Sequence, residues 1–101
     1  MKSTLVGLYG QANKKLKTPN LQQPLTAKLL GDTIKARRTQ SDLRLEDAAA
    51  LCGVAKETFM KIEHGQSNCQ LASVLQICSG LGINLYIKPW VENGGDENDW
   101  S

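Results

Sequence analysis

The chain has 101 residues, of which 41% are hydrophobic, so we expect one small domain with a modest core plus tails rather than several domains. Residues 1–88 hold all 12 basic residues and six acidic ones, a net charge of +6, whereas residues 89–101 hold four acidic residues and no basic one. A basic body suits a polyanionic partner, and an acidic tail favours disorder or a different partner.

The first 24 residues are predicted to form an arm. Residues 11–24 combine Asn, Gln, Thr, two prolines and the lysines Lys14, Lys15 and Lys17, a composition that favours an arm over a packed element. These lysines either contact phosphates or only keep the segment soluble. The apolar stretch at residues 3–9 is too short for a signal-peptide core or a membrane span. It could add a strand, dock on the body or contact a partner.

A helix is predicted next, because Leu30-Gly31, Ile34 and Arg38 recur at helical spacing. The run from Leu45 to His64 then has the pattern of a helix-turn-helix.

In the predicted helix-turn-helix, Ala49, supported by Ala48 and Cys52, is small enough for two helices to cross closely. Gly53 lies four residues later and can adopt the positive φ that a sharp turn requires. The second helix has a core side and an outward side, formed respectively by Val54, Phe59 and Ile62 and by Lys56, Glu57, Met60 and Lys61. Any αα-hairpin can show this spacing, so the identification as a helix-turn-helix depends also on the helices predicted before and after it.

A further helix and a single strand are predicted downstream. An i, i+3, i+4, i+7 stripe of apolar residues is formed by Leu71, Val74, Leu75, Cys78 and Leu81. Residues 83–88 alternate apolar and polar side chains like a half-buried strand, and the chain has no obvious second strand to pair with it. Because a lone strand is not stable, we expect two copies of the chain to pair their strands across a twofold axis.

From Leu30 to Ile83 the chain resembles the Cro/repressor-type (Xre) helix-turn-helix domain. The resemblance is carried, in chain order, by Leu30-Gly31, Ile34, Arg38, Ala49-x-x-x-Gly53-Val54, Ile62-Glu63-x-Gly65 and Gly80-Leu81-Gly82-Ile83. It implies a mainly α, Cro/repressor-like bundle that binds double-stranded DNA. With one C-terminal β-strand pairing across a dimer, the layout is similar to that of HipB-type antitoxins. That similarity implies a homodimer, a palindromic operator, a kinase-like (HipA-like) toxin as partner, and a role as antitoxin and autorepressor of the operon.

The start of the second motif helix is the expected DNA-recognition surface, because a helix enters the major groove by its N-terminal turns. Lys56 is expected to donate to guanine, and Glu57 to accept from cytosine or to repel phosphate. Ala55 and Thr58 are expected to meet thymine methyl groups. Lys61 lies further along and is expected to contact a phosphate, where it sets affinity rather than specificity. The alternative for each is an ordinary solvated helix face.

Phosphate contacts are also expected at the start of the first motif helix and in the loop after the second. In the resemblance, Arg44 stands where a Ser or Thr cap is usual, and Leu45 stands where a DNA-contacting Gln is usual. Arg44 can still reach a phosphate as a cation, but Leu45 cannot donate a hydrogen bond. The loop contributes Gln66, Ser67 and Asn68 as donors, although Asn68 alternatively caps the next helix.

The resemblance further implies that Arg38 pairs with Glu63 inside the domain, which leaves Arg37 as the freer cation for DNA. Dimer contacts are expected from Ile83, Leu85, Tyr86, Ile87 and Trp90. The chain thus divides into an arm (1–24), a DNA-binding and dimerisation domain (25–90) and an acidic tail (91–101).

The acidic tail ends with one large aromatic residue, Trp100, in an otherwise polar strip. An exposed Trp is a frequent hot spot for a partner protein. HipB-type antitoxins end in a mobile tail, so Trp100 is the expected anchor for the toxin. Alternatively, it packs on its own domain or is disordered.

No enzymatic chemistry is expected. Cys52, Cys69 and Cys78 form no C-x-x-C pair, which favours reduced thiols in the cytoplasm. His64 is the only histidine, and no metal-spaced cluster or Gly-rich phosphate loop is present, so neither cofactor nor metal is expected. Two alternatives to the antitoxin remain: a free-standing phage-type repressor without a toxin, and a helix-turn-helix used only for protein contacts.

Overall fold

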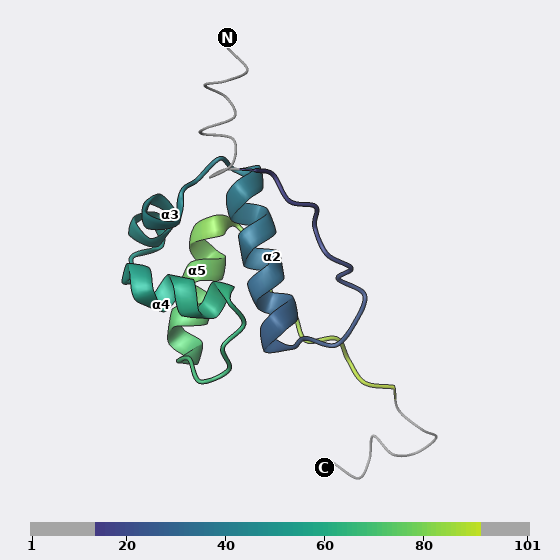
Figure 1. Cartoon of the computed structure of the whole chain (residues 1–101). Coiled ribbons are helices and arrows are strands. Elements are labelled where there is room, and N and C mark those ends of the chain that lie inside the picture. The colour runs from purple at the N-terminus through teal and green to yellow at the C-terminus, as the bar shows by residue number, and fades with distance from the viewer. Residues whose placement is uncertain (1–13, 92–101) are drawn as a thin grey trace.

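Four helices make up the regular structure of residues 14–91, the part of the chain that the computed structural model describes. They are α2 (Ala27–Gln40), α3 (Leu45–Cys52), α4 (Lys56–Glu63) and α5 (Leu71–Leu81). Figure 1 shows α2 and α5 running in the same direction, with α3 and α4 on one side of them. Helix α2 packs mainly on α4, and α3 packs on α5 and α4. The predicted mainly helical domain is therefore confirmed.

The helix ends follow from local chemistry. The hydroxyl of Thr26 accepts a hydrogen bond from the Leu29 backbone N–H at 3.0 Å and so caps the start of α2. Gly53 ends α3 in the left-handed conformation with φ of 74°, as predicted, and Gly82 ends α5 in the same way with φ of 75°. The turn between α3 and α4 is thus short enough to form a helix-turn-helix.

The core lies where the four helices meet. Its largest fully buried side chains are Phe59, Ile34, Ile62 and Ile77. The predicted small residues at the α3 crossing are also buried, namely Ala48, Ala49 and Cys52. Close packing of these alanines allows α3 to lie against both α4 and α5.

The stripe predicted for α5 was partly wrong. Val74, Cys78 and Leu81 are buried as expected, but Leu71 and Leu75 are 68% and 49% exposed. Ile77 is fully buried instead. The helix therefore turns Leu71 and Leu75 away from the centre of the core, and Leu75 instead lines a groove with residues 83–86.

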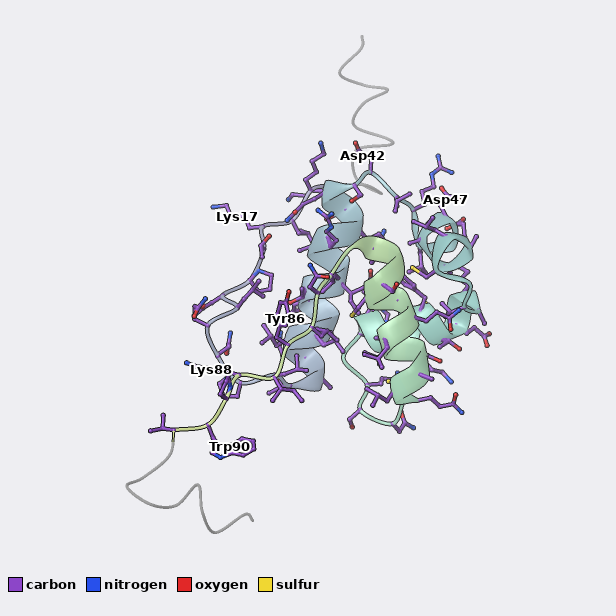
Figure 2. The ribbon with its side chains drawn as sticks, turned by 180° about the vertical axis from the view of Figure 1, so that it is seen from behind. Lys17, Asp42, Asp47, Tyr86, Lys88 and Trp90 are labelled. Carbon is purple, nitrogen blue, oxygen red and sulfur yellow. The ribbon has the colours of Figure 1, made fainter. Side chains whose placement is uncertain are left out.

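The chain beyond α5 is extended and largely exposed. Ile83 still packs against the core, and its N–H donates to the Cys78 carbonyl at 2.8 Å. From Asn84 to Val91 every residue is exposed, and residues 14–91 contain no strand. The two views agree that this segment lies over α2, on the side away from the viewer in Figure 1 and toward the viewer in Figure 2. The predicted strand thus has no partner within the described chain.

No helix of the described residues is long and apolar enough to cross a membrane.

Candidate nucleic-acid interface

Burial of one face of α4 determines which residues its opposite face presents to solvent. Phe59 and Ile62 are 0% and 2% exposed, so they fix how α4 is rotated on the core. This rotation leaves Ala55, Lys56, Glu57 and Lys61 exposed, as the sequence predicted. Thr58 is half-buried, and so is Met60, which was expected to face outward. The solvent-facing surface of α4 is therefore narrower than expected and is centred on its first turn.

Three helices of the domain begin without a side-chain cap. Their N-cap residues are Arg44 for α3, Ala55 for α4 and Gln70 for α5, and none of the three makes a capping hydrogen bond through its side chain. At α2, by contrast, Thr26 provides one. The first backbone N–H groups of an α-helix have no partner inside the helix, and together with the helix dipole they attract anions. The start of α5 thus offers donors to phosphate, whereas at α3 and α4 the first-turn carboxylates of Glu46, Asp47 and Glu57 oppose the attraction of the backbone N–H groups.

The start of α3 holds the two residues that depart from the pattern of the resembled domain, Arg44 and Leu45. Arg44 is the exposed N-cap residue in extended conformation. Leu45, the first residue of the helix, is half-buried and packs against the core. Leu45 therefore stabilises the fold at a position where the related domains use a polar contact, and any phosphate contact here comes from Arg44 or from backbone N–H groups.

The loop between α4 and α5 presents its polar residues to solvent. Gln66, Ser67 and Asn68 are all exposed, and Gly65 adopts a φ of 80°. The thiol of Cys69 donates to the Gln66 carbonyl at 2.8 Å and so fixes the loop from inside. The alternative role of Asn68 as a helix cap is wrong, because α5 begins after Gln70. The amide of Asn68 therefore remains a candidate phosphate donor.

Arg37 has an internal role that the sequence did not indicate. Its Nε donates to the Leu81 carbonyl at 2.8 Å, which joins the last turn of α2 to the end of α5. It is exposed, whereas Arg38 is buried and bonded to Glu63, so Arg37 is the freer of the two cations, as predicted, although its Nε is already engaged. The structure places it at this junction, whereas the other candidate contacts lie on α4, at the start of α3 and in the loop after α4.

Arg38 and Glu63 form the predicted pair. Arg38 Nε lies 2.6 Å from Glu63 Oε2, and both side chains are almost fully buried. The pair joins α2 to the end of α4, so it fixes the position of α4 on α2.

Two of the three thiols, Cys52 and Cys78, are buried in the core. Burial raises the pKa of the Cys52 thiol, and burial together with the neighbouring Cys52 raises that of Cys78. A raised pKa keeps a thiol protonated and unreactive at neutral pH. Among residues 14–91 no group of three or more His, Cys, Asp and Glu could hold a metal ion.

The comparison with protein families finds a helix-turn-helix domain at residues 29–84, more than half of the chain. These limits run from the first turn of α2 to just beyond α5, so they include all four helices. The comparison with curated proteins finds no match.

Proposed function

Because the chain belongs to the helix-turn-helix domain family, we propose that it binds a palindromic operator as a homodimer and represses transcription of its own operon. The observation that carries this proposal is the exposed first turn of α4, a helix that begins without a side-chain cap. Two such helices related by a twofold axis would enter successive major grooves about one DNA turn apart. The protein acts by occupancy, without catalysis or a cofactor.

The dimer is supported by apolar surface that the single chain leaves uncovered. Tyr86 and Ile87 are 88% and 89% exposed, and Leu75 is about half exposed. A shallow groove lies between α5 and the extended segment, lined by Leu75, Cys78, Ser79, Ile83, Asn84, Leu85 and Tyr86. Exposed apolar surface of this extent is a mark of an interface. Pairing of residues 83–88 with a second copy would cover it and satisfy the extended backbone.

The finer proposal is an antitoxin of the HipB type that binds a HipA-like kinase toxin. It rests on the order of the elements, a four-helix domain followed by an extended apolar segment and an acidic tail. The proposed anchor, Trp100, lies outside the described residues. A free-standing repressor would use the same α4 surface and would need no such anchor.

The role of Lys56 can be separated from that of Lys61 by substituting each with Ala. Lys56→Ala is expected to weaken operator binding by ~1 to 3 kcal/mol and to relax base preference at one position of each half-site. Lys61→Ala removes the same charge from the same helix, but it should weaken all sequences alike and make the salt dependence shallower. Binding of a randomised operator library, sequenced after selection, measures both effects. Unchanged base preference in Lys56→Ala would remove Lys56 from the recognition surface.

The antitoxin role is tested by co-purifying the products of adjacent genes with the tagged full-length protein, and with the same protein lacking Trp100 and Ser101. A kinase-sized companion that is retained by the full chain and lost on truncation is the expected result. Tight binding to upstream DNA with no companion would instead favour the free-standing repressor. The mass of the protein measured by light scattering on the same samples tests the dimer, and a monomer at micromolar concentration would contradict it.

A further inference from the structure

Residues 14–18, here called the pinned arm, are fixed to the last turn of α2 by side chains. The Leu16 N–H donates to the hydroxyl of Thr39 at 3.1 Å, and the Leu16 carbonyl accepts from Nε2 of Gln40 at 2.7 Å. The same Nε2 also donates to the Thr18 hydroxyl at 3.0 Å. Both backbone groups of Leu16 are thus bonded to the domain. Since Lys15 and Lys17 flank Leu16 in the chain, these bonds also fix where the two lysines lie.

The pinned arm carries a net charge of +3, whereas the helix-turn-helix carries none. From Arg44 to Lys61 three basic residues are balanced by the three carboxylates of Glu46, Asp47 and Glu57. The pinned arm holds three lysines and no acidic residue, and all three lysines are exposed. Helix α4 therefore does not itself supply the electrostatic attraction on which DNA affinity largely depends.

The arm lies beside the approach to α3. Lys15 Nζ is 3.7 Å from Asp42 Oδ2, and Asp42 is two residues before the N-cap of α3. In Figure 2, Asp42 lies between Lys17 and Asp47, which are on opposite sides of the upper part of the molecule, and Tyr86, Lys88 and Trp90 lie below them. The side chains of Lys15 and Asp42 are 62% and 65% exposed, so their ion pair contributes little stability and exchanges readily for another anion. Lys15 also offsets a carboxylate that would repel phosphate at the start of α3.

We propose that the pinned arm is a second phosphate-binding surface, which contacts the DNA backbone beside the approach to α3. This inference rests on the proposed DNA binding. It assigns Thr39 and Gln40 as positioning residues, since they hold the arm through Leu16 and Thr18, and it assigns Lys15 and Lys17 as the cations that meet the backbone. A phosphate contact made this way adds affinity without base preference.

The test compares the salt dependence of binding to a random-sequence duplex of about 30 base pairs, because phosphate contacts do not depend on sequence. Each lost contact makes the log–log salt slope shallower by roughly 0.9, so Lys15→Ala/Lys17→Ala should lower it by about 2 per bound subunit. Lys28→Ala/Lys35→Ala removes the same charge from exposed sites of α2 outside the arm and should leave the slope nearly unchanged. Circular dichroism serves to check that both variants keep their helices.

A third variant separates the effect of the arm's position from the effect of the protein's net charge. Gln40→Ala keeps every lysine but removes two of the three bonds that hold the arm, so it should also make the slope shallower. An arm variant whose slope equals that of Lys28→Ala/Lys35→Ala would overturn this inference while leaving the proposed function intact. Wild-type protein that shows no salt-dependent binding to any duplex would overturn both.

Discussion

Substitution of Glu63 by Gln is expected to destabilise the domain by about 3 to 5 kcal/mol, a large part of the stability of a chain of this size. The Glu63 carboxylate accepts from Arg38 Nε at 2.6 Å and from Nη2 at 3.2 Å. The side chains of the two residues are only 7% and 3% exposed. Gln keeps the shape of Glu63 but leaves the Arg38 cation buried without a counter-charge, which costs more than the loss of the hydrogen bonds alone.

A double-mutant cycle measures the interaction by chemical unfolding. Arg38→Met should also be severe, because it leaves the Glu63 carboxylate buried and removes the donor to the Leu43 carbonyl at 2.9 Å. The double variant Arg38→Met/Glu63→Leu should be closer to wild type than either single variant, since it leaves no unpaired charge. Asp32→Asn breaks the exposed Lys28 pair on α2 and serves as control, with an expected change below about 0.5 kcal/mol. Additive losses in the double variant would contradict this account.

The helix-turn-helix could be predicted in detail because its signals are local. Ala49 is small where helices cross, and Gly53 is the residue type that adopts positive φ at low cost. Both requirements concern a few neighbouring residues, so they can be recognised in the sequence alone. The Arg38–Glu63 pair, 25 residues apart, came instead from the resemblance to related domains, because spacing gives no information about partners that far apart.

The remaining errors concern contacts between distant segments. Leu71 and Leu75 fit the same periodic stripe as Val74, and only the way α5 packs decides which of them are buried. The bond from Arg37 to the end of α5 likewise depends on how two helices far apart in the sequence are placed. For the same reason, the arm appeared as an unstructured lysine-rich leader. The polar residues that hold it, Thr39 and Gln40, carry no pattern that identifies them as partners of Leu16.

The candidate interface was predicted more accurately on α4 than around it. The exposure of Lys56, Glu57 and Lys61 follows from helix periodicity once Phe59 and Ile62 are placed in the core. The roles of loop residues are harder to predict, because a shift of one residue in the start of a helix changes which residue is its cap. The sequence offered Asn68 as the cap of α5, but the helix begins two residues later, after Gln70, which provides no side-chain cap. A loop donor and an uncapped helix start thus lie together.

Gly31→Ala is expected to lower stability by about 2 kcal/mol or more, although alanine is the better helix former by about 1 kcal/mol. A Cβ at this position in α2 would lie 2.5 Å from the Glu63 carbonyl oxygen and 2.9 Å from that of Ile62. These are backbone atoms at the end of α4, so no side-chain rotation can relieve the clash, and the two helices must move apart. The steric term therefore outweighs helix propensity.

The same displacement would shift α4 relative to α3, so Gly31→Ala should weaken DNA binding even at temperatures where the variant is folded. Lys35→Ala, a substitution to the same residue type at an exposed position of the same helix, should change stability by no more than about 0.5 kcal/mol. Thermal unfolding and DNA titration on both variants measure the two effects. A Gly31→Ala protein as stable as wild type would mean that α2 and α4 are not packed backbone to backbone at this crossing, and the Arg38–Glu63 pair would then be their main connection.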